Sequence, residues 1–241
     1  MRIAVLSDIH SNLVALDAVI ASLGTVDAVW HLGDVVGYGP EPDAVVERLD
    51  GLGAVGVRGN HDAAAVGRGD EAEYFNVDAR RAIEWTRATI RPATAARLAA
   101  LPERLLEGDF TLVHGSPRAP IWEYVTSAPV ARASLRAIET RYCLHGHTHV
   151  PAVFRDDDGS LELIAPRDGS VLHLDQRQVM INPGSVGQPR DGDRDASYLV
   201  LDTERSEATW RRVPYDIAAT QARMRELRLP ERLVARLDHG L

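Results

Sequence analysis

Five short polar motifs, each placed directly after an apolar run, constrain the fold of this chain more than any other feature. In order, the motifs are Asp8-Ile9-His10, Gly33-Asp34, Gly59-Asn60-His61-Asp62, His114-Gly115 and Gly146-His147-Thr148-His149. The apolar runs before them have the composition of buried strands, at 3–6, 28–32, 54–57, 110–113 and 142–144. In an open α/β sheet, groups that follow the carboxyl ends of the strands meet in one crevice. The pattern therefore predicts one site that gathers Asp, His and Asn side chains from five strand ends.

Helical patterns between the first strands indicate the fold class. Apolar residues recur at helical spacing over 13–23 and 41–52, so strands and helices alternate along the first third of the chain. Such alternation favours a parallel sheet with right-handed crossovers. Two longer helical stretches are predicted further on, at 78–101 and 129–140.

The last third of the chain has a different pattern. Turn signals such as Asp158-Gly159 and Asp168-Gly169 separate short strand-like runs, which favours antiparallel hairpins. The runs lie at 152–154, 161–164, 170–174, 179–181, 198–201 and 208–213, and helical patterns follow at 216–227 and 231–237. Because we find no internal repeat, low-complexity tract or linker, we expect residues 1–241 to form a single α/β domain with a mixed two-sheet core.

The residue types in the five motifs point to metal ions. Residues i and i+2 of an extended chain point the same way, so Asp8 pairs with His10, and His147 with His149. Seven candidate ligands result, namely Asp8, His10, Asp34, Asn60, His114, His147 and His149. One structural zinc takes four ligands, so seven suit two divalent ions that share a bridging carboxylate. Mixed imidazole and carboxylate ligation favours transition metals over calcium or magnesium, and we expect manganese or iron before zinc.

Each motif alone has an ordinary structural explanation. A single Asp-x-His at a strand end is usually a turn or capping element, and two nearby histidines are more often coincidence than ligands. The joint occurrence of all five motifs, in order and at strand ends, decides for a metal centre. By contrast, His31 and His145 lie within apolar strand runs and are expected to pack in the core, while His173 and His239 belong to no motif.

Charge and cysteine content narrow the class of protein. A formal charge of −8 disfavours a broad cationic surface for nucleic acid. Two aspartates against two divalent ions still leave a local positive centre, which would attract a phosphate ester. The single cysteine, Cys143, allows no internal disulfide, and the N-terminal run lacks the features of a signal peptide or a membrane span. We expect a cytoplasmic protein without membrane contact.

With these motifs, the chain resembles the calcineurin-like metallophosphoesterase superfamily, and most closely its small bacterial and archaeal phosphodiesterases. The order D-x-H, GD, GNHD, HG, GHTH runs from Asp8 to His149, and the later Asn-Pro-Gly-Ser-Val-Gly segment at 182–187 also matches. The resemblance implies a four-layer αββα sandwich of two mixed β-sheets flanked by helices, with the metals at its upper edge. Protein phosphatases of this superfamily follow GD with Asp-Arg-Gly, whereas Gly33-Asp34 here continues as Val35-Val36-Gly37. Phosphoprotein substrates are therefore not expected.

The resemblance also implies a role for each matched position. Asp8, His10 and His149 would hold the first metal; Asn60, His114 and His147 would hold the second; and Asp34 would bridge both. A hydroxide held between the ions would attack the phosphorus, and His61 matches the family's proton donor to the leaving group. Two alternatives stay open here: His61 could act only through its neighbours, and Asp62 could either orient His61 or cap the following turn.

The substrate is less constrained by the sequence. Aromatic side chains close to the motifs could stack on a nucleobase, or could equally pack the loops. They are Tyr38, Tyr74, Phe75, Trp122 and Tyr124. Arg190, after the Asn-Pro-Gly-Ser turn, could contact a phosphate oxygen or be solvated. We expect a phosphodiester of nucleotide or dinucleoside-polyphosphate type first, and a phosphomonoester second.

Two other classes of protein, a metal-free interaction scaffold and a DNA nuclease, fit the sequence less well than an enzyme of this kind. The same fold can serve as a metal-free interaction scaffold, but such a scaffold is expected to lose ligand histidines, and all seven ligands and His61 are present. A DNA nuclease is disfavoured by the net charge and by the lack of an obvious duplex-binding appendage. The expected partner is a small phosphoester, with no stable nucleic-acid partner, and the sequence leaves the formation of a homo-oligomer open.

Overall fold

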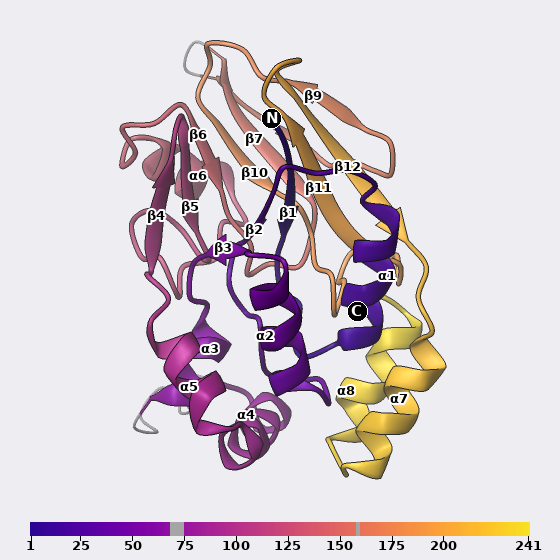
Figure 1. The fold of residues 1–241 in the computed structure, drawn as a ribbon. Helices are drawn as coiled ribbons and strands as arrows, with labels where there is room; N and C mark the ends of the chain where they lie inside the picture. Colours follow the sequence, from indigo (N-terminus) through magenta and orange to yellow (C-terminus); the bar gives the residue numbers. More distant parts are fainter. Residues whose placement is uncertain (68–74, 158–159) are drawn as a thin grey trace.

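Two β-sheets form the centre of the molecule (Figure 1). The computed structural model describes residues 1–67, 75–157 and 160–241, and the strands among these residues form two six-stranded sheets. The first sheet contains, in spatial order, β3 (Val55–Gly56), β2 (Ala28–His31), β1 (Arg2–Leu6), β11 (Ala196–Asp202), β12 (Glu207–Val213) and β9 (Val171–His173). The second contains β4 (Arg104–Glu107), β5 (Phe110–Val113), β6 (Tyr142–Leu144), β10 (Val179–Asn182), β7 (Ala152–Asp157) and β8 (Ser160–Ile164).

Both sheets are mixed, as predicted. In the first sheet, β1, β2 and β3 pair in parallel, while β11, β12 and β9 continue the sheet through antiparallel pairs. In the second, β5, β6 and β10 pair in parallel, and β4, β7 and β8 are added antiparallel. The parallel strands of the first sheet are those separated by helical patterns, and the β7–β8 and β11–β12 hairpins follow the strand-like runs of the last third.

Alternation of side chains along the strands explains the layers. Ile3 and Val5 of β1 pack in the apolar core between the two sheets, while Ala4 and Leu6 face outward and pack against helices. The helices on the outer faces are α1 (Leu13–Ser22) and α2 (Pro42–Gly51) over the first sheet and α6 (Ala128–Leu135) over the second. The result is the four-layer αββα sandwich that the family resemblance implies.

Some elements differ in detail from the prediction. The helical stretch 78–101 is two helices, α4 (Val77–Thr89) and α5 (Pro92–Ala99), because a proline disfavours helical backbone at the residue before it. The sequence patterns did not predict the half-exposed strand β4 or the short helix α3 (Asn60–Val66). The turn signal Asp158-Gly159 lies outside the described residues, although β7 and β8 on either side of it pair as an antiparallel hairpin.

The last helices pack beside the loop that follows β2. They are α7 (Ile217–Glu226), α8 (Glu231–Ala235) and the 3₁₀ helix η2 (Arg236–Asp238). Met224, Leu233 and Leu237 from these helices share one apolar cluster with Ala82 of α4 and with Tyr38. Within the described residues, no helix is both long enough and apolar enough to cross a bilayer.

Candidate metal centre

The seven candidate ligands meet at the edge of the sandwich where the parallel strands end. The loops after β1, β2, β3, β5 and β6 supply them, as the motif pattern predicts. All seven are buried, with Asp8 and His114 at 0 % exposure and Asn60, the most exposed, at 4 %. Their His and Asp members form two groups of convergent ligand atoms, and Asp34 belongs to both groups.

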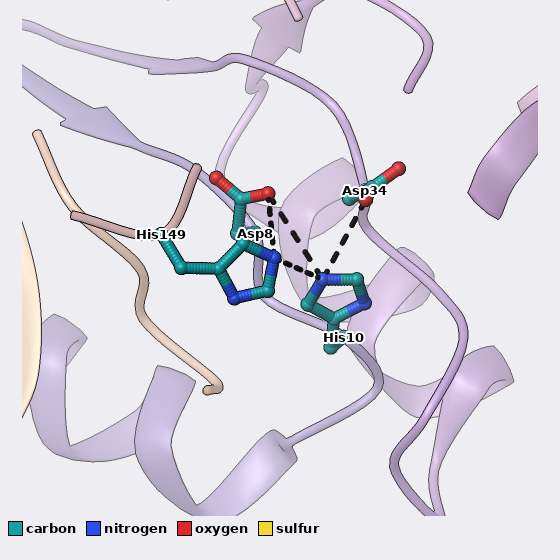
Figure 2. A group of neighbouring side chains, drawn as sticks. All are labelled: Asp8, His10, Asp34 and His149. Atoms are coloured by element: carbon teal, nitrogen blue, oxygen red, sulfur yellow. Dashed lines mark hydrogen bonds and ion pairs between the residues drawn. The ribbon is translucent and has the colours of Figure 1, made fainter. Parts of the chain in front are cut away.

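Figure 2 shows the first group, which consists of Asp8, His10, Asp34 and His149. His10 Nε2 lies 3.1 Å from His149 Nε2 and 3.5 Å from Asp34 Oδ2. Asp8 Oδ1 lies 3.3 Å from His149 Nε2, and this buried oxygen accepts no hydrogen bond from any described residue. Four side chains therefore direct nitrogen and oxygen atoms into the same small volume.

Backbone carbonyls determine which imidazole nitrogens face that volume. His10 Nδ1 donates to the carbonyl oxygen of Val36 at 3.2 Å, and His149 Nδ1 donates to that of Gln188 at 2.7 Å. A carbonyl oxygen only accepts, so each Nδ1 carries the proton and each Nε2 presents a lone pair. Burial lowers the pKa of both rings well below the usual histidine value, which keeps them neutral. Two lone pairs 3.1 Å apart with no hydrogen between them suit a bound cation.

The second group surrounds His114. Its Nε2 lies 3.0 Å from both Asn60 Oδ1 and His147 Nδ1, and 3.3 Å from Asp34 Oδ2, while its Nδ1 donates to the Leu32 carbonyl oxygen at 2.8 Å. Burial lowers the pKa of His114, but the carboxylates of Asp34 and Asp8 outweigh burial and raise it to about 9. This group of acceptors therefore requires a positive charge, which either a proton on His114 or a metal ion provides.

Asp34 connects the two groups. Its Oδ1 accepts a hydrogen bond from the backbone N–H of His61 at 2.8 Å. Its Oδ2 lies 3.5 Å from His10 Nε2 and 3.3 Å from His114 Nε2. One carboxylate oxygen thus faces both groups, which is the arrangement expected of a bridge between two ions. The donor set, its burial and the unpartnered Asp8 Oδ1 all fit two divalent metal ions.

Left-handed backbone at the strand ends brings these side chains together. Five of the candidate ligands have a positive φ: Asp8 (52°), His10 (50°), Asp34 (50°), His147 (67°) and His149 (61°). Residues other than glycine rarely adopt this conformation, which costs roughly 1–2 kcal/mol each. Hydrogen bonds between loops hold it in place, because Asp8 N donates to the Gly33 carbonyl at 3.1 Å and His10 N to the Asp34 carbonyl at 2.9 Å. Gly59 permits a close approach to Asp34, since a Cβ there would lie 2.1 Å from Asp34 Oδ1.

His61 and Asp62 lie in the first turn of α3 and have different neighbours. The His61 ring packs against His10 and Tyr38, with centroids 4.8 and 4.3 Å apart, and its Nδ1 has no hydrogen-bond partner among the described residues. Asp62 accepts from the backbone N–H groups of Gly59, at 2.9 Å, and Val36, at 3.0 Å. Asp62 therefore caps α3 and ties it to the loop after β2, which decides between the two alternatives left by the sequence in favour of capping.

A cavity of about 180 Å³ opens beside the two groups of ligands. Its wall includes Asp34, Asn60, His61, His147 and His149, together with all three predicted substrate-binding residues, Arg190, Tyr38 and Trp122. The Arg190 guanidinium lies over the Tyr38 ring, 5.6 Å from its centroid. The cavity thus joins the candidate metal centre to a cationic side and to an aromatic side.

The aromatic residues around the cavity are not equivalent. Tyr38 is only 7 % exposed and packs against His10 and His61, so its ring supports the centre. Trp122 and Phe75 are partly exposed and contact each other edge to face, with centroids 5.8 Å apart. Tyr124 is 50 % exposed and stacks on His147 at 3.7 Å. Tyr74, the fifth aromatic considered from the sequence, lies outside the described residues.

The sequence motifs do not mark two further residues near the site. Gln188, 2 % exposed, accepts hydrogen bonds at its side-chain oxygen from Arg190 Nη2, at 3.0 Å, and from Arg236 Nη1, at 3.1 Å. Gln188 follows the Asn-Pro-Gly-Ser-Val-Gly segment directly, and that position could have drawn attention to it. Arg236 lies in η2, outside every motif, and reaches the cavity wall only through the packing of the C-terminal helices.

A family model and similar proteins of known sequence or structure all indicate the same family. The family model described as the calcineurin-like phosphoesterase superfamily domain matches residues 1–206. The uncharacterized protein MJ0912 of Methanocaldococcus jannaschii is 37% identical over 245 residues, which cover 99% of this chain and 98% of that protein. A metallophosphoesterase from Sphaerobacter thermophilus has a similar crystal structure, with a TM-score of 0.92, 46% identity and complete coverage of both chains. The hypothetical protein PH1004 of Pyrococcus horikoshii OT3 shares the fold, with a TM-score of 0.80, 21% identity and coverage of 100% and 98% of the two chains.

Proposed function

The chain belongs to the calcineurin-like phosphoesterase superfamily, and on this premise we propose that it is a two-metal phosphodiesterase acting on a nucleotide-type substrate. The observation that carries the proposal is the position of Asp34 Oδ2, which faces ligand atoms of both groups at 3.5 and 3.3 Å. A carboxylate shared in this way would serve as a ligand to two ions beside the cavity. When bound, two such ions supply an activated water and neutralise charge on the phosphoryl oxygens.

The chain's own residues have distinct roles in this proposal. Asp8, His10 and His149 would hold one ion; Asn60, His114 and His147 would hold the other; and Asp34 would serve both. The backbone carbonyls of Val36, Leu32 and Gln188 fix three of the imidazoles with their Nε2 atoms facing inward. The ligands are thereby oriented before any ion arrives, which lowers the cost of ordering them on binding.

His61 is the proposed proton donor to the leaving group. It lines the cavity, its Nδ1 is unpartnered among the described residues, and burial lowers its pKa to about 4. The free ring is therefore neutral near pH 7. A negatively charged phosphoester next to the ring favours the imidazolium, so protonation accompanies substrate binding. The protonated ring can then transfer its proton to the departing oxygen.

The wall of the cavity favours a substrate with a base over a base-free monoester. Trp122, Phe75 and Tyr124 present partly exposed rings beside the candidate metal centre. A nucleobase stacked on one aromatic ring is stabilised by roughly 1–3 kcal/mol. A nucleotide phosphodiester or a dinucleoside polyphosphate would use these rings, whereas a small phosphomonoester would not.

A screen of hydrolysis with manganese-loaded protein tests the proposal. The substrates are phosphomonoesters, cyclic nucleotides, nucleotide diesters and dinucleoside polyphosphates, and we expect kcat/KM to be highest for the last two classes. Trp122→Ala should raise KM for those substrates about 10-fold, and Trp122→Phe, which keeps a ring, should restore most of the loss. Preference for a base-free monoester, together with no effect of Trp122→Ala, would refute the substrate class. A metal content far below one ion per chain would instead support the scaffold alternative.

A further inference from the structure

The cationic side of the cavity contains two arginines from distant parts of the chain. Arg190 lies in the loop between β10 and β11, and Arg236 comes from η2, thirty residues beyond the end of the family-model match at residue 206. Both guanidinium groups donate to the same side-chain oxygen of Gln188, at 3.0 and 3.1 Å, and both line the cavity. Gln188 is buried, and its backbone carbonyl oxygen accepts a hydrogen bond from His149 Nδ1 at 2.7 Å. Gln188 thus links both arginines to the candidate ligand His149.

No carboxylate lies in salt-bridge contact with either arginine of this pair among the described residues. In the described part of the chain, neither Arg190 nor Arg236 forms a salt bridge with a carboxylate, whereas surface arginines such as Arg91 and Arg225 do. The buried Nε atoms of Arg190 and Arg236 also have no hydrogen-bond partner among the described residues. Two cations that share one neutral acceptor repel each other and leave donors unsatisfied.

Burial and the neighbouring cation both act against the charge on Arg236. Its pKa is lowered by burial first and by Arg190 second, while Tyr38 and Asp78 act in the opposite direction without reversing the shift. An anion placed between the two guanidinium groups would remove this repulsion and would satisfy the unpartnered donors. Arg190 also connects the pair to the metal centre, since its guanidinium lies over Tyr38, which packs on His10 and His61. Arg236 is held beside Arg190 through their shared contact with Gln188.

We propose that Arg190, Gln188 and Arg236 form a second anion subsite, which binds the phosphate adjacent to the phosphoryl group that reacts at the metals. This inference rests on the proposed function and restricts it to substrates with a phosphoanhydride, such as dinucleoside polyphosphates. A diester with a single phosphate has no group to place in the subsite. Arg236, supplied by the C-terminal helices, is then a specificity-determining residue that selects for the second phosphate.

Arg236→Gln tests the subsite, and Arg232→Gln is the matched control, because Arg232 lies exposed on the adjoining helix α8. Manganese-loaded proteins are compared on diadenosine tetraphosphate and on bis(4-nitrophenyl) phosphate, which carries one phosphate. Arg236→Gln should lower kcat/KM for the tetraphosphate about 10-fold or more, mainly by raising KM. For the single-phosphate diester, kcat/KM should change less than about 2-fold. Arg232→Gln should change neither, and Arg236→Lys should recover part of the loss.

A binding measurement separates failure of this inference from failure of the proposed function. Methylenediphosphonate, which cannot be hydrolysed at its bridge, and inorganic phosphate are titrated into the same manganese-loaded proteins by calorimetry. Arg236→Gln should weaken the diphosphonate about 10-fold and phosphate by less than about 2-fold. If the parent chain hydrolyses no phosphoester, this ratio still reports on the subsite. If Arg236→Gln loses affinity equally for both ligands, loses kcat/KM equally for both esters, or loses neither, the subsite is refuted. The proposed function still stands in that case if the parent chain hydrolyses phosphodiesters.

Discussion

Replacing Gly59 by alanine should disable both metal positions without touching a ligand. The φ of Gly59 is −94°, so alanine is not strained by the backbone there. The added Cβ, however, would lie 2.1 Å from Asp34 Oδ1 and 2.3 Å from Asp34 N, well inside the 3.4–4 Å of ordinary contact. Asp34 or the loop of Gly59 must therefore move by roughly 1 Å, whereas metal–ligand distances tolerate about 0.2 Å. Since Asp34 faces both groups, both ions should be lost or weakened together.

We expect Gly59→Ala to contain less than one metal ion per chain and to lose at least about 10²-fold in kcat. Its free energy of unfolding should fall by about 1–3 kcal/mol, as for other overpacked sites. The control is Gly51→Ala at the end of α2, where a Cβ would meet nothing within 4 Å and which should be neutral or slightly stabilising. Metal content by mass spectrometry, unfolding and steady-state rates are measured on both variants. Two retained ions and a rate close to that of the parent would refute the position of Asp34 as a shared ligand.

Three further predictions follow from the same contacts. Asp34→Asn should reduce the content of both ions together, and loss of only one ion by mass spectrometry would contradict the bridge. His61→Ala should retain the metals but slow alkyl phosphodiesters about 10²–10⁴-fold and nitrophenyl esters less, and equal losses would point to a positioning role. Burial lowers the pKa of His31 to about 4 from 6.5, so its neutral form stabilises the fold fully above pH 6.5, and this stability is lost as the pH falls toward 4. In metal-free protein, the free energy of unfolding should fall between pH 7 and pH 4.5 by about 2–3 kcal/mol less in His31→Gln than in the parent chain. An equal fall in both proteins would show that His31 does not cause it.

Buried strands followed by motifs were the most predictable part of the molecule. The run 110–113 was predicted from its continuous apolar sequence and is observed as β5 with four buried residues. The meeting of Asp8, Asp34 and His114 at one edge followed from the rule that parallel strands end together. In these cases the local sequence pattern and the tertiary contacts favour the same structure, so the pattern was sufficient.

Features that depend on distant packing were not predictable. The strand β4 alternates between exposed and half-buried residues and has charged ends, so its sequence gives a weak signal. The choice for Asp62 between orienting His61 and capping α3 was settled by the Val36 N–H, which is 26 residues away. Arg236 reaches the cavity because Leu233 and Leu237 pack near Tyr38, and no local motif marks that contact.

The left-handed backbone of the ligand loops has a consequence for protein engineering. Short peptides that copy Gly146-His147-Thr148-His149 or Asp8-Ile9-His10 would relax to ordinary backbone, because each positive φ costs roughly 1–2 kcal/mol and nothing in a free peptide opposes the relaxation. In the folded chain, neighbouring loops hold the conformation through bonds such as that from His10 N to the Asp34 carbonyl. Grafting this centre onto a different scaffold would therefore require the strand ends of both sheets, in their relative positions, and not the motifs alone.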